Sequence, residues 1–215
     1  MIQSDAQKPA AGDGLQQLQR RRKRALRVLA ALCAALLLVV DSSWRTAAPA
    51  LVTVLQFLGL SLILLCIFGR TWCTLYIGGH KKRELIMAGP YSLVRNPLYV
   101  FTFIGTAGLG LLAGSFVLAL AFLALAVAVF TPVVRAEEAF LVDAFGDAFR
   151  SYAASVARFW PRFSRWEDAE ELRVKPTLVV RTFADASLFL LAVPLIILKE
   201  LAHASGWLPI LLPLM

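Results

Sequence analysis

The chain has 215 residues, of which 59% are hydrophobic and 17% are charged, and its formal net charge is +8. Its mean hydropathy is +0.71. These values are typical of an integral membrane protein and exclude both an ordinary soluble domain and a disordered chain. The three cysteines are scattered and form no CxxC pattern, so we expect neither a structural disulfide nor a metal site.

The N-terminal part predicts a basic tail followed by two membrane spans. Six basic residues precede or open the first apolar run: Arg20, Arg21, Arg22, Lys23, Arg24 and Arg27. We expect a flexible basic cytoplasmic tail over 1–25 and two transmembrane helices within 26–69, at about 26–43 and 47–69. Nucleic-acid binding is the alternative reading of the basic cluster, but so apolar a chain argues against a nucleic-acid partner.

A long uncharged run follows, with 39 residues between Arg95 and Arg135. One straight helix of that length would measure about 58 Å at ~1.5 Å per residue, twice the thickness of a bilayer core. The run therefore predicts a helical hairpin over 98–134, with Ala113-Gly114-Ser115 as its turn. Such a hairpin returns both charged ends to the same membrane face.

Basic residues also predict the orientation of the chain in the membrane. The segment 70–97 carries five basic residues against the single acid Glu84, whereas the first connection between spans has only Arg45 beside Asp41. By the positive-inside rule, the N-terminus and both ends of the hairpin face the cytoplasm. We expect the protein in a bacterial inner membrane.

The tract after the hairpin predicts a cytoplasmic helix over 135–160. Four apolar residues recur there at helical spacing and define one face: Phe145, Phe149, Tyr152 and Val156. With the preceding loop and the hairpin, this helix completes a core region over 70–176.

Residues 177–215 form a hydrophobic C-terminal segment. Its apolar stretch from Phe183 to Leu198 is interrupted by Pro194, and Trp207 to Met215 is too short to span a bilayer. That last stretch is expected to lie in the interface or to turn back. The predicted fold class is an all-α integral membrane protein with about five transmembrane helices, a tight hairpin and a cytoplasmic helical cofactor-binding segment.

Charged groups at the two ends of the hairpin are the candidates for chemistry. Arg135 and Glu138 share a helix face next to Glu137, and Arg95 stands opposite, at the start of the third span. Two carboxylates and two guanidiniums at one membrane mouth can bind a zwitterion. The structural alternative is an anchoring arginine and a surface ion pair worth less than ~1 kcal/mol.

These residues resemble a known family. Gly89-Pro90-Tyr91, Val94-Arg95-Asn96-Pro97 and Tyr99, followed by a hairpin and Arg135-Ala136-Glu137-Glu138, are similar to isoprenylcysteine carboxyl methyltransferases. The likeness continues through Phe145-Gly146, Tyr152 and the Val156…Arg158…Pro161 ending, and covers about residues 85–162. It extends to related membrane phospholipid methyltransferases through Gly108-Leu109-Gly110.

The resemblance implies a membrane methyltransferase that uses S-adenosyl-L-methionine, with a cofactor pocket on the cytoplasmic side and a lipid substrate entering between helices. Arg95 and Arg135 would orient the acidic group of the substrate, with Asn96 beside them. The implied cofactor-binding residues are Glu137, Glu138, Tyr91, Pro97, Tyr99, Gly108 and Gly110. Small residues such as these two glycines also serve close helix packing, which is the alternative for them.

Asn96 departs from the family pattern, which usually has His in an Arg-His-Pro motif. Asparagine does not titrate, so it is no base, but it still forms hydrogen bonds. A carboxylate or phosphate is already ionised at neutral pH and needs no base, whereas an ethanolamine headgroup must first lose a proton. We therefore expect O-methylation of a lipophilic acid. The alternatives are a phospholipid N-methyltransferase acting on phosphatidylethanolamine and a non-enzymatic transporter or assembly factor.

Overall fold

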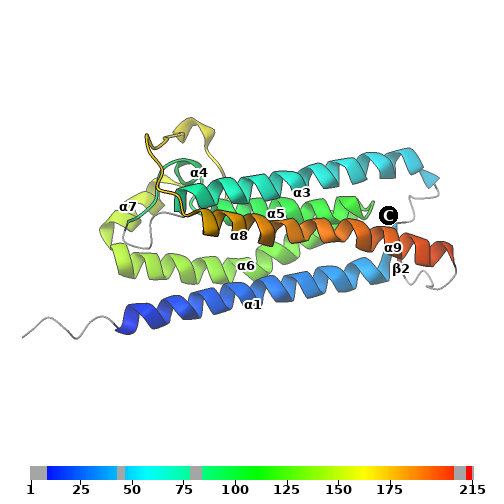
Figure 1. The fold of residues 1–215 in the computed structure, drawn as a ribbon, viewed down its shortest axis with the longest axis horizontal. Helices are drawn as coiled ribbons and strands as arrows, with labels where there is room; N and C mark the ends of the chain where they lie inside the picture. Colours follow the sequence, from blue (N-terminus) through cyan, green and yellow to red (C-terminus); the bar gives the residue numbers. More distant parts are fainter. Residues whose placement is uncertain (1–8, 43–46, 78–83, 206–211, 215) are drawn as a thin grey trace, which may run out of the picture.

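Long helices lie side by side along one axis (Figure 1). The structure, a computed structural model, describes residues 9–42, 47–77, 84–205 and 212–214. Its long helices are α1 (Pro9–Val39), α3 (Pro49–Ile77), α5 (Pro97–Leu112), α6 (Phe116–Phe145), and a last rod of α8 (Pro176–Ser187), the 3₁₀ helix η2 (Leu188–Leu191) and α9 (Ala192–Ala204). The predicted all-α fold class is confirmed. The described residues add one short parallel pairing, between β1 (Val40–Ser42) and β2 (Leu212–Leu214).

Three of the described helices are long and apolar enough to cross a membrane: Pro49–Ile77, Phe116–Phe145 and Pro176–His203. Helix α5 is apolar but has 16 residues, fewer than the ~20 that usually span the hydrocarbon core. The apolar part of α1 follows its basic residues and is shorter still. For α1 and α5, the predicted count of about five spans stays a prediction.

The turn between α5 and α6 lies where the uncharged run predicts it. Helix α5 ends at Leu112, and α6 begins at Phe116. Gly114 has a φ of 78°, a backbone conformation that favours glycine. Ser115 caps α6, since its side-chain oxygen accepts a hydrogen bond from the amide of Leu118 at 3.2 Å. The predicted hairpin is confirmed.

Two helices extend beyond their predicted bounds. Helix α1 already begins at Pro9, so residues 9–25, expected to belong to a flexible tail, are helical. Helix α6 continues unbroken to Phe145, so the boundary predicted at residue 134 lies inside it. The charged residues after that boundary are mostly separated by alanine and leucine, which favour helix, and charge alone does not end a helix.

The predicted cytoplasmic helix over 135–160 is in fact the end of α6 plus a second helix. Gly146, with a φ of 55°, separates α6 from α7 (Asp147–Ser155). The predicted apolar face is buried: Phe149, Tyr152 and Val156 form a cluster against residues that include Phe145 and Leu85.

Pro194 interrupts the last rod only mildly. Proline has no N–H to donate, and its ring crowds the carbonyl one turn earlier, which is where η2 lies. The rod packs on α3. Of the predicted stretch Trp207 to Met215, residues 207–211 and 215 lie outside the described part of the chain, and Leu212–Leu214 turn back to pair with β1.

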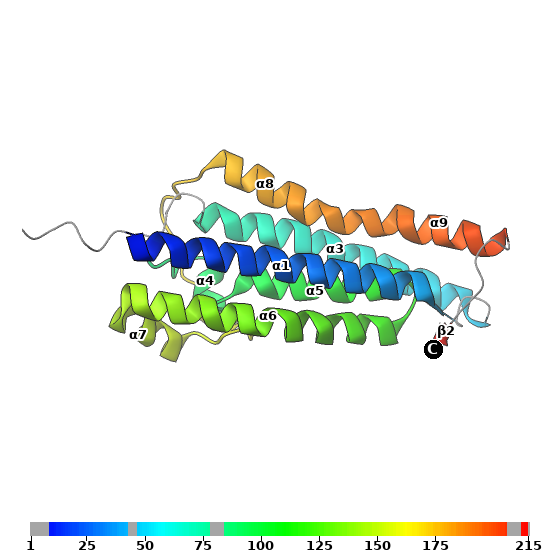
Figure 2. The same ribbon diagram turned by 90° about the horizontal axis from the view of Figure 1, so that it is seen from below.

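Several short elements gather at the end of the bundle where α3 and α6 finish (Figures 1 and 2). They are α4 (Pro90–Leu93), α7 and a strap over 156–175 that contains η1 (Phe163–Arg165). The amide of Arg95 donates to the carbonyl of Ala157 at 2.9 Å, and the amide of Arg162 donates to Leu93 at 3.0 Å. These bonds tie the strap to the segment that leads into α5, so both ends of the hairpin meet one set of short elements.

Candidate functional site

The carboxylate of Glu138 is the centre of a polar network at this end of the bundle. Glu138 lies on α6 and is 7% exposed. Asn96 Nδ2 donates to its Oε1 at 2.9 Å, and Arg158 donates to its Oε2 from Nε at 3.0 Å and from Nη2 at 2.7 Å. The Nε of Arg95 lies 3.7 Å from Oε1. Two separate segments, residues 95–96 and the strap, therefore converge on the buried carboxylate of α6.

Local backbone features explain how these side chains reach Glu138. Pro97 takes the first position of α5, where its missing N–H leaves no helical bond unmade. Asn96 is the residue before that helix, and its amide also lies 3.4 Å from the carbonyl of Arg158. Arg158 returns to α6 because the chain reverses at Gly146 and α7 runs back beside α6.

Opposite charges hold the network together, and its side chains are partly shielded from water. The side chain of Arg158 is 37% exposed, whereas that of Glu138 is 9% exposed. The hydrogen bond to Glu138 raises the pKa of the Arg158 guanidinium, which outweighs the lowering by burial. Breaking such a pair by removing one partner leaves an uncompensated buried charge, which is costly.

An open pocket of about 520 Å³ lies beside this network, between α6 and α7. Four guanidiniums line it, from Arg95, Arg135, Arg150 and Arg158, and Glu138 is the one carboxylate in its lining. Its volume falls within the ~300–1,000 Å³ usual for small-molecule sites. The pocket is therefore suited to an anion or a zwitterion.

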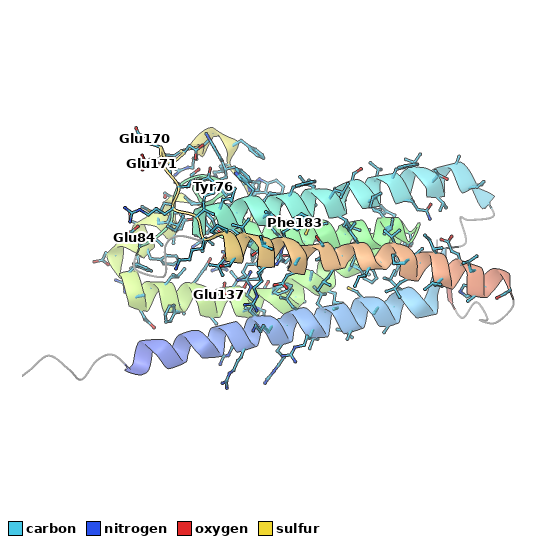
Figure 3. The ribbon with its side chains drawn as sticks, viewed as in Figure 1. Tyr76, Glu84, Glu137, Glu170, Glu171 and Phe183 are labelled. Atoms are coloured by element: carbon cyan, nitrogen blue, oxygen red, sulfur yellow. The ribbon has the colours of Figure 1, made fainter. Side chains whose placement is uncertain are left out.

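Glu137 faces different groups from Glu138, because adjacent residues of a helix point about 100° apart. Glu137 (Figure 3) interacts electrostatically with Tyr99 of α5 and with Arg22 of α1. Tyr91 and Tyr99 are 7% and 4% exposed. Within the described residues the hydroxyl of Tyr91 has no hydrogen-bond partner, whereas that of Tyr99 faces the carboxylate of Glu137. Burial raises the pKa of the Tyr91 phenol well above its usual value, so this hydroxyl is a donor.

Gly108 and Gly110 lie away from these groups, near the hairpin turn. A methyl group at Gly110 would meet the backbone nitrogen of Ala119 in α6 at 2.1 Å, and one at Gly108 would meet the carbonyl oxygen of Gly59 in α3 at 2.8 Å. Along α5, Gly108 is about 18 Å from Asn96 at ~1.5 Å per residue. Helix packing explains both glycines, and this placement does not support the cofactor-binding role predicted for them.

The structure thus brings Arg95, Asn96 and Glu138 together and places Arg135 on the same pocket. It also adds Arg158, which the motif contains but which spacing alone does not identify as a site residue. Its side chain contacts a carboxylate that lies 20 positions earlier in the sequence. This contact depends on the reversal of the chain at Gly146, and helical periodicity does not predict that reversal.

Tyr152 supports the same region from α7. Its hydroxyl donates to the carbonyl of Tyr91 at 2.7 Å, and burial raises the pKa of its phenol.

Cys33, Cys66 and Cys73 are buried and free. The described ranges contain no group of three or more His, Cys, Asp or Glu side chains that could hold a metal ion.

Comparisons with known proteins identify a family and several relatives. The family model for phospholipid methyltransferases matches residues 44–148. The chain is 40% identical to the nickel-cobalt-cadmium resistance protein NccN of Alcaligenes xylosoxydans xylosoxydans, over 80% of this chain and 79% of that protein. It is 38% identical to the cobalt-zinc-cadmium resistance protein CzcN of Cupriavidus metallidurans, over 88% and 86%.

A shorter match involves a named methyltransferase. The chain is 38% identical to the protein-S-isoprenylcysteine O-methyltransferase of Schizosaccharomyces pombe, over 36% of this chain and 33% of that protein. No solved structure matches the chain.

Proposed function

This chain belongs to the phospholipid methyltransferase family, which resembles the isoprenylcysteine methyltransferases, and from that premise we propose an S-adenosyl-L-methionine-dependent methyltransferase of the membrane. Its substrate is a lipophilic acid, methylated on a carboxylate or phosphate oxygen. The observation that carries the proposal is the buried Glu138, held by Asn96 and Arg158 beside a pocket rich in guanidiniums. By the positive-inside rule, this end of the bundle faces the cytoplasm.

The residues present fit the methyl donor. When bound, S-adenosyl-L-methionine supplies a methyl group from its sulfonium centre. Glu137 offers acceptor oxygens for an amino group or for ribose hydroxyls, and the hydroxyl of Tyr91 is a buried donor without a partner among the described residues. The hydroxyl of Tyr99 faces the carboxylate of Glu137. Both oxygens of Glu138 already accept bonds from the protein, so its main role is to hold Asn96 and Arg158 in place.

Arginines of the pocket bind the substrate's acid in this proposal. Arg135 is exposed and lines the pocket. Arg95 lines it too, with its Nε 3.7 Å from Glu138 Oε1. Methyl transfer is an in-line displacement, so the chain contributes mainly positioning and exclusion of water. Asn96 donates to Glu138 and takes no proton, which suits a nucleophile that is already ionised.

The alternative enzyme is a phospholipid N-methyltransferase acting on phosphatidylethanolamine. That reaction would need a base to remove a proton from the amine, and Glu137 is the carboxylate placed for it. The family membership supports either methyltransferase over a non-enzymatic transporter or assembly factor.

One experiment tests the enzyme, its orientation and the bond formed. Inverted and right-side-out vesicles containing the full-length protein are incubated with methyl-labelled S-adenosyl-L-methionine, and the labelled lipid is then treated with base. We expect labelling in inverted vesicles alone and release of volatile methanol from a carboxyl ester. A base-stable label that co-migrates with N-methylated phosphatidylethanolamine would contradict O-methylation.

The matched variant is Glu138→Gln, which keeps the shape of the side chain and removes its charge. We expect it to lose most of the methyl transfer and to weaken cofactor binding in calorimetry, because Arg158 and Arg95 lose their counter-charge. Unchanged binding and turnover in a folded variant would remove Glu138 from the site.

A further inference from the structure

Three large aromatic side chains lie exposed on the strap between α7 and α8. The exposed fractions are 79% for Trp160, 76% for Phe163 and 46% for Trp166. Large apolar side chains gathered on one exposed segment mark a surface that contacts a membrane or a partner. Neither the Glu138 network nor the pocket beside it uses any of the three.

The strap presents these side chains on a backbone that is tied to the bundle. Phe159, next to Trp160, packs inward against Phe103 of α5, with ring centres 5.4 Å apart. On the other side of Trp160, the amide of Arg162 donates to the carbonyl of Leu93 at 3.0 Å. The exposure of Trp160 is therefore a property of the folded strap, because the residues on both sides of it are held.

A stacking contact places the strap beside the end of a membrane-length helix. Trp166 stacks on Trp72 of α3, with ring centres 5.7 Å apart and ring planes 22° apart. Trp72 belongs to the apolar helix Pro49–Ile77 and lies about 8 Å from its end at ~1.5 Å per residue. One turn earlier on that helix, Phe68 is 64% exposed. The strap aromatics therefore continue the exposed apolar surface of α3 at the depth where membrane proteins are rich in tryptophan.

Charges divide this part of the strap into an aromatic half, residues 159–166, and an acidic half, residues 167–171. The aromatic half carries Arg162 and Arg165 and no acid. The acidic half carries four acids and no basic residue: Glu167, Asp168, Glu170 and Glu171. Both arginine side chains are exposed, and in the described ranges neither has an acid within 4.0 Å. Guanidiniums without a counter-charge beside aromatic rings suit the phosphates of lipid headgroups.

The acidic half lies further from the membrane-length helices. Tyr76, in the last turn of α3, donates from its hydroxyl to Asp168 at 2.8 Å. Figure 3 shows Glu170 and Glu171 beyond Tyr76, at the outer edge of this end of the bundle. Lipid phosphates repel carboxylates, so this half suits water.

We propose that the aromatic half of the strap docks in the headgroup layer of the membrane. Trp160 and Phe163 insert among the headgroups, and Arg162 and Arg165 pair with lipid phosphates, while the acidic half stays in water. The inference goes beyond the proposed function, because a strap docked on the membrane requires no methyl transfer.

Spin labels on the two halves test the depth of the strap. Phe163→Cys and Glu171→Cys are labelled separately with a nitroxide in the full-length protein, reconstituted in mixed vesicles of dioleoylphosphatidylcholine and dioleoylphosphatidylglycerol. Apolar oxygen concentrates in lipid and a polar nickel chelate stays in water, so we expect the ratio of their collision rates to be several-fold higher at position 163 than at position 171. The unaltered chain, whose Cys33, Cys66 and Cys73 are buried, is the blank for labelling.

Arg162→Gln tests the contact with lipid phosphates. In the protein labelled at position 163, it should lower the collision ratio by about half, because a charge-assisted bond to phosphate is lost. The matched control is Arg173→Gln, which removes the same charge from an exposed position of the strap after the acidic half. This control should leave the ratio unchanged.

Three results would overturn the inference. Equal collision ratios at positions 163 and 171 would place the aromatic half in water. Low collision rates with both reagents at position 163 would mean that another protein chain covers it. Equal effects of Arg162→Gln and Arg173→Gln would mean a general effect of charge and no built contact with phosphate.

Discussion

Asn96 donates a hydrogen bond in a position where the resembling family usually has a histidine. Its Nδ2 lies 2.9 Å from Glu138 Oε1, a geometry that an imidazole N–H can also provide. Asparagine and histidine can both donate this hydrogen bond, but only histidine can also gain or lose a proton. That loss is the reason for expecting a substrate that arrives ionised.

We predict that Asn96→His keeps methyl transfer within a few-fold, whereas Asn96→Asp reduces it by at least about tenfold, or ~1.4 kcal/mol of barrier. The aspartate has nearly the same size but places a second carboxylate against Glu138, and like charges at this distance repel. Initial rates with the labelled methyl donor measure both variants.

The effect of pH provides the control for this prediction. The Asn96→Asp defect should shrink as the pH falls, since a protonated carboxyl again donates to Glu138. A fully active aspartate variant beside an inactive histidine variant would contradict the donor role of Asn96.

Among single residues, Arg158 marks the limit of sequence reasoning. The pairing of Arg95 with the Glu137-Glu138 dipeptide could be predicted, because an uncharged run too long for one span must bring its ends together. The partner of Glu138 from the strap could not, because its approach depends on the backbone at Gly146 and on the packing of Phe149 and Tyr152.

Among the helices, α5 lies unusually close to its neighbours. Gly59, Gly108 and Gly110 let the backbones of α3, α5 and α6 touch near the hairpin turn. In a membrane, where apolar burial does not drive helices together, such contact supplies much of the packing energy. By holding α5 against its neighbours near the hairpin turn, these glycines help to position the site at the opposite end of the same helix.

Gly110→Ala should lower the melting temperature of the purified protein. Its methyl group would lie 2.1 Å from the backbone nitrogen of Ala119, and helices must separate to admit it, at a cost of about 1–3 kcal/mol. Unfolding in detergent, followed by tryptophan fluorescence, measures the change.

Ala121→Val is the matched control, because it adds methyl groups to an exposed position of α6 in the same hairpin. It should leave the melting temperature nearly unchanged. Equal melting temperatures for Gly110→Ala and the unaltered protein would contradict the packing role of Gly110.

At the scale of the whole molecule, the names of the two long relatives concern resistance to nickel, cobalt, zinc and cadmium. Those names describe the relatives, and growth on cobalt or cadmium of a metal-sensitive host lacking its own relative tests whether this chain shares the trait. Expression of the unaltered protein is compared there with expression of Glu138→Gln. Equal rescue by a stably expressed Glu138→Gln variant would separate tolerance from methyl transfer.

Hydropathy, span length and charge spacing predict the fold class, the hairpin and the meeting of Arg95 with Glu138, because these properties act locally along the chain. Contacts between distant segments are not encoded in such spacing and become visible only in the folded molecule. The structure shows that α1 is helical from Pro9 and turns Arg22 inward, that Arg158 completes the Glu138 network, and that Gly108 packs against α3. Each depends on which helix face meets which neighbour, and that is set by packing between distant segments.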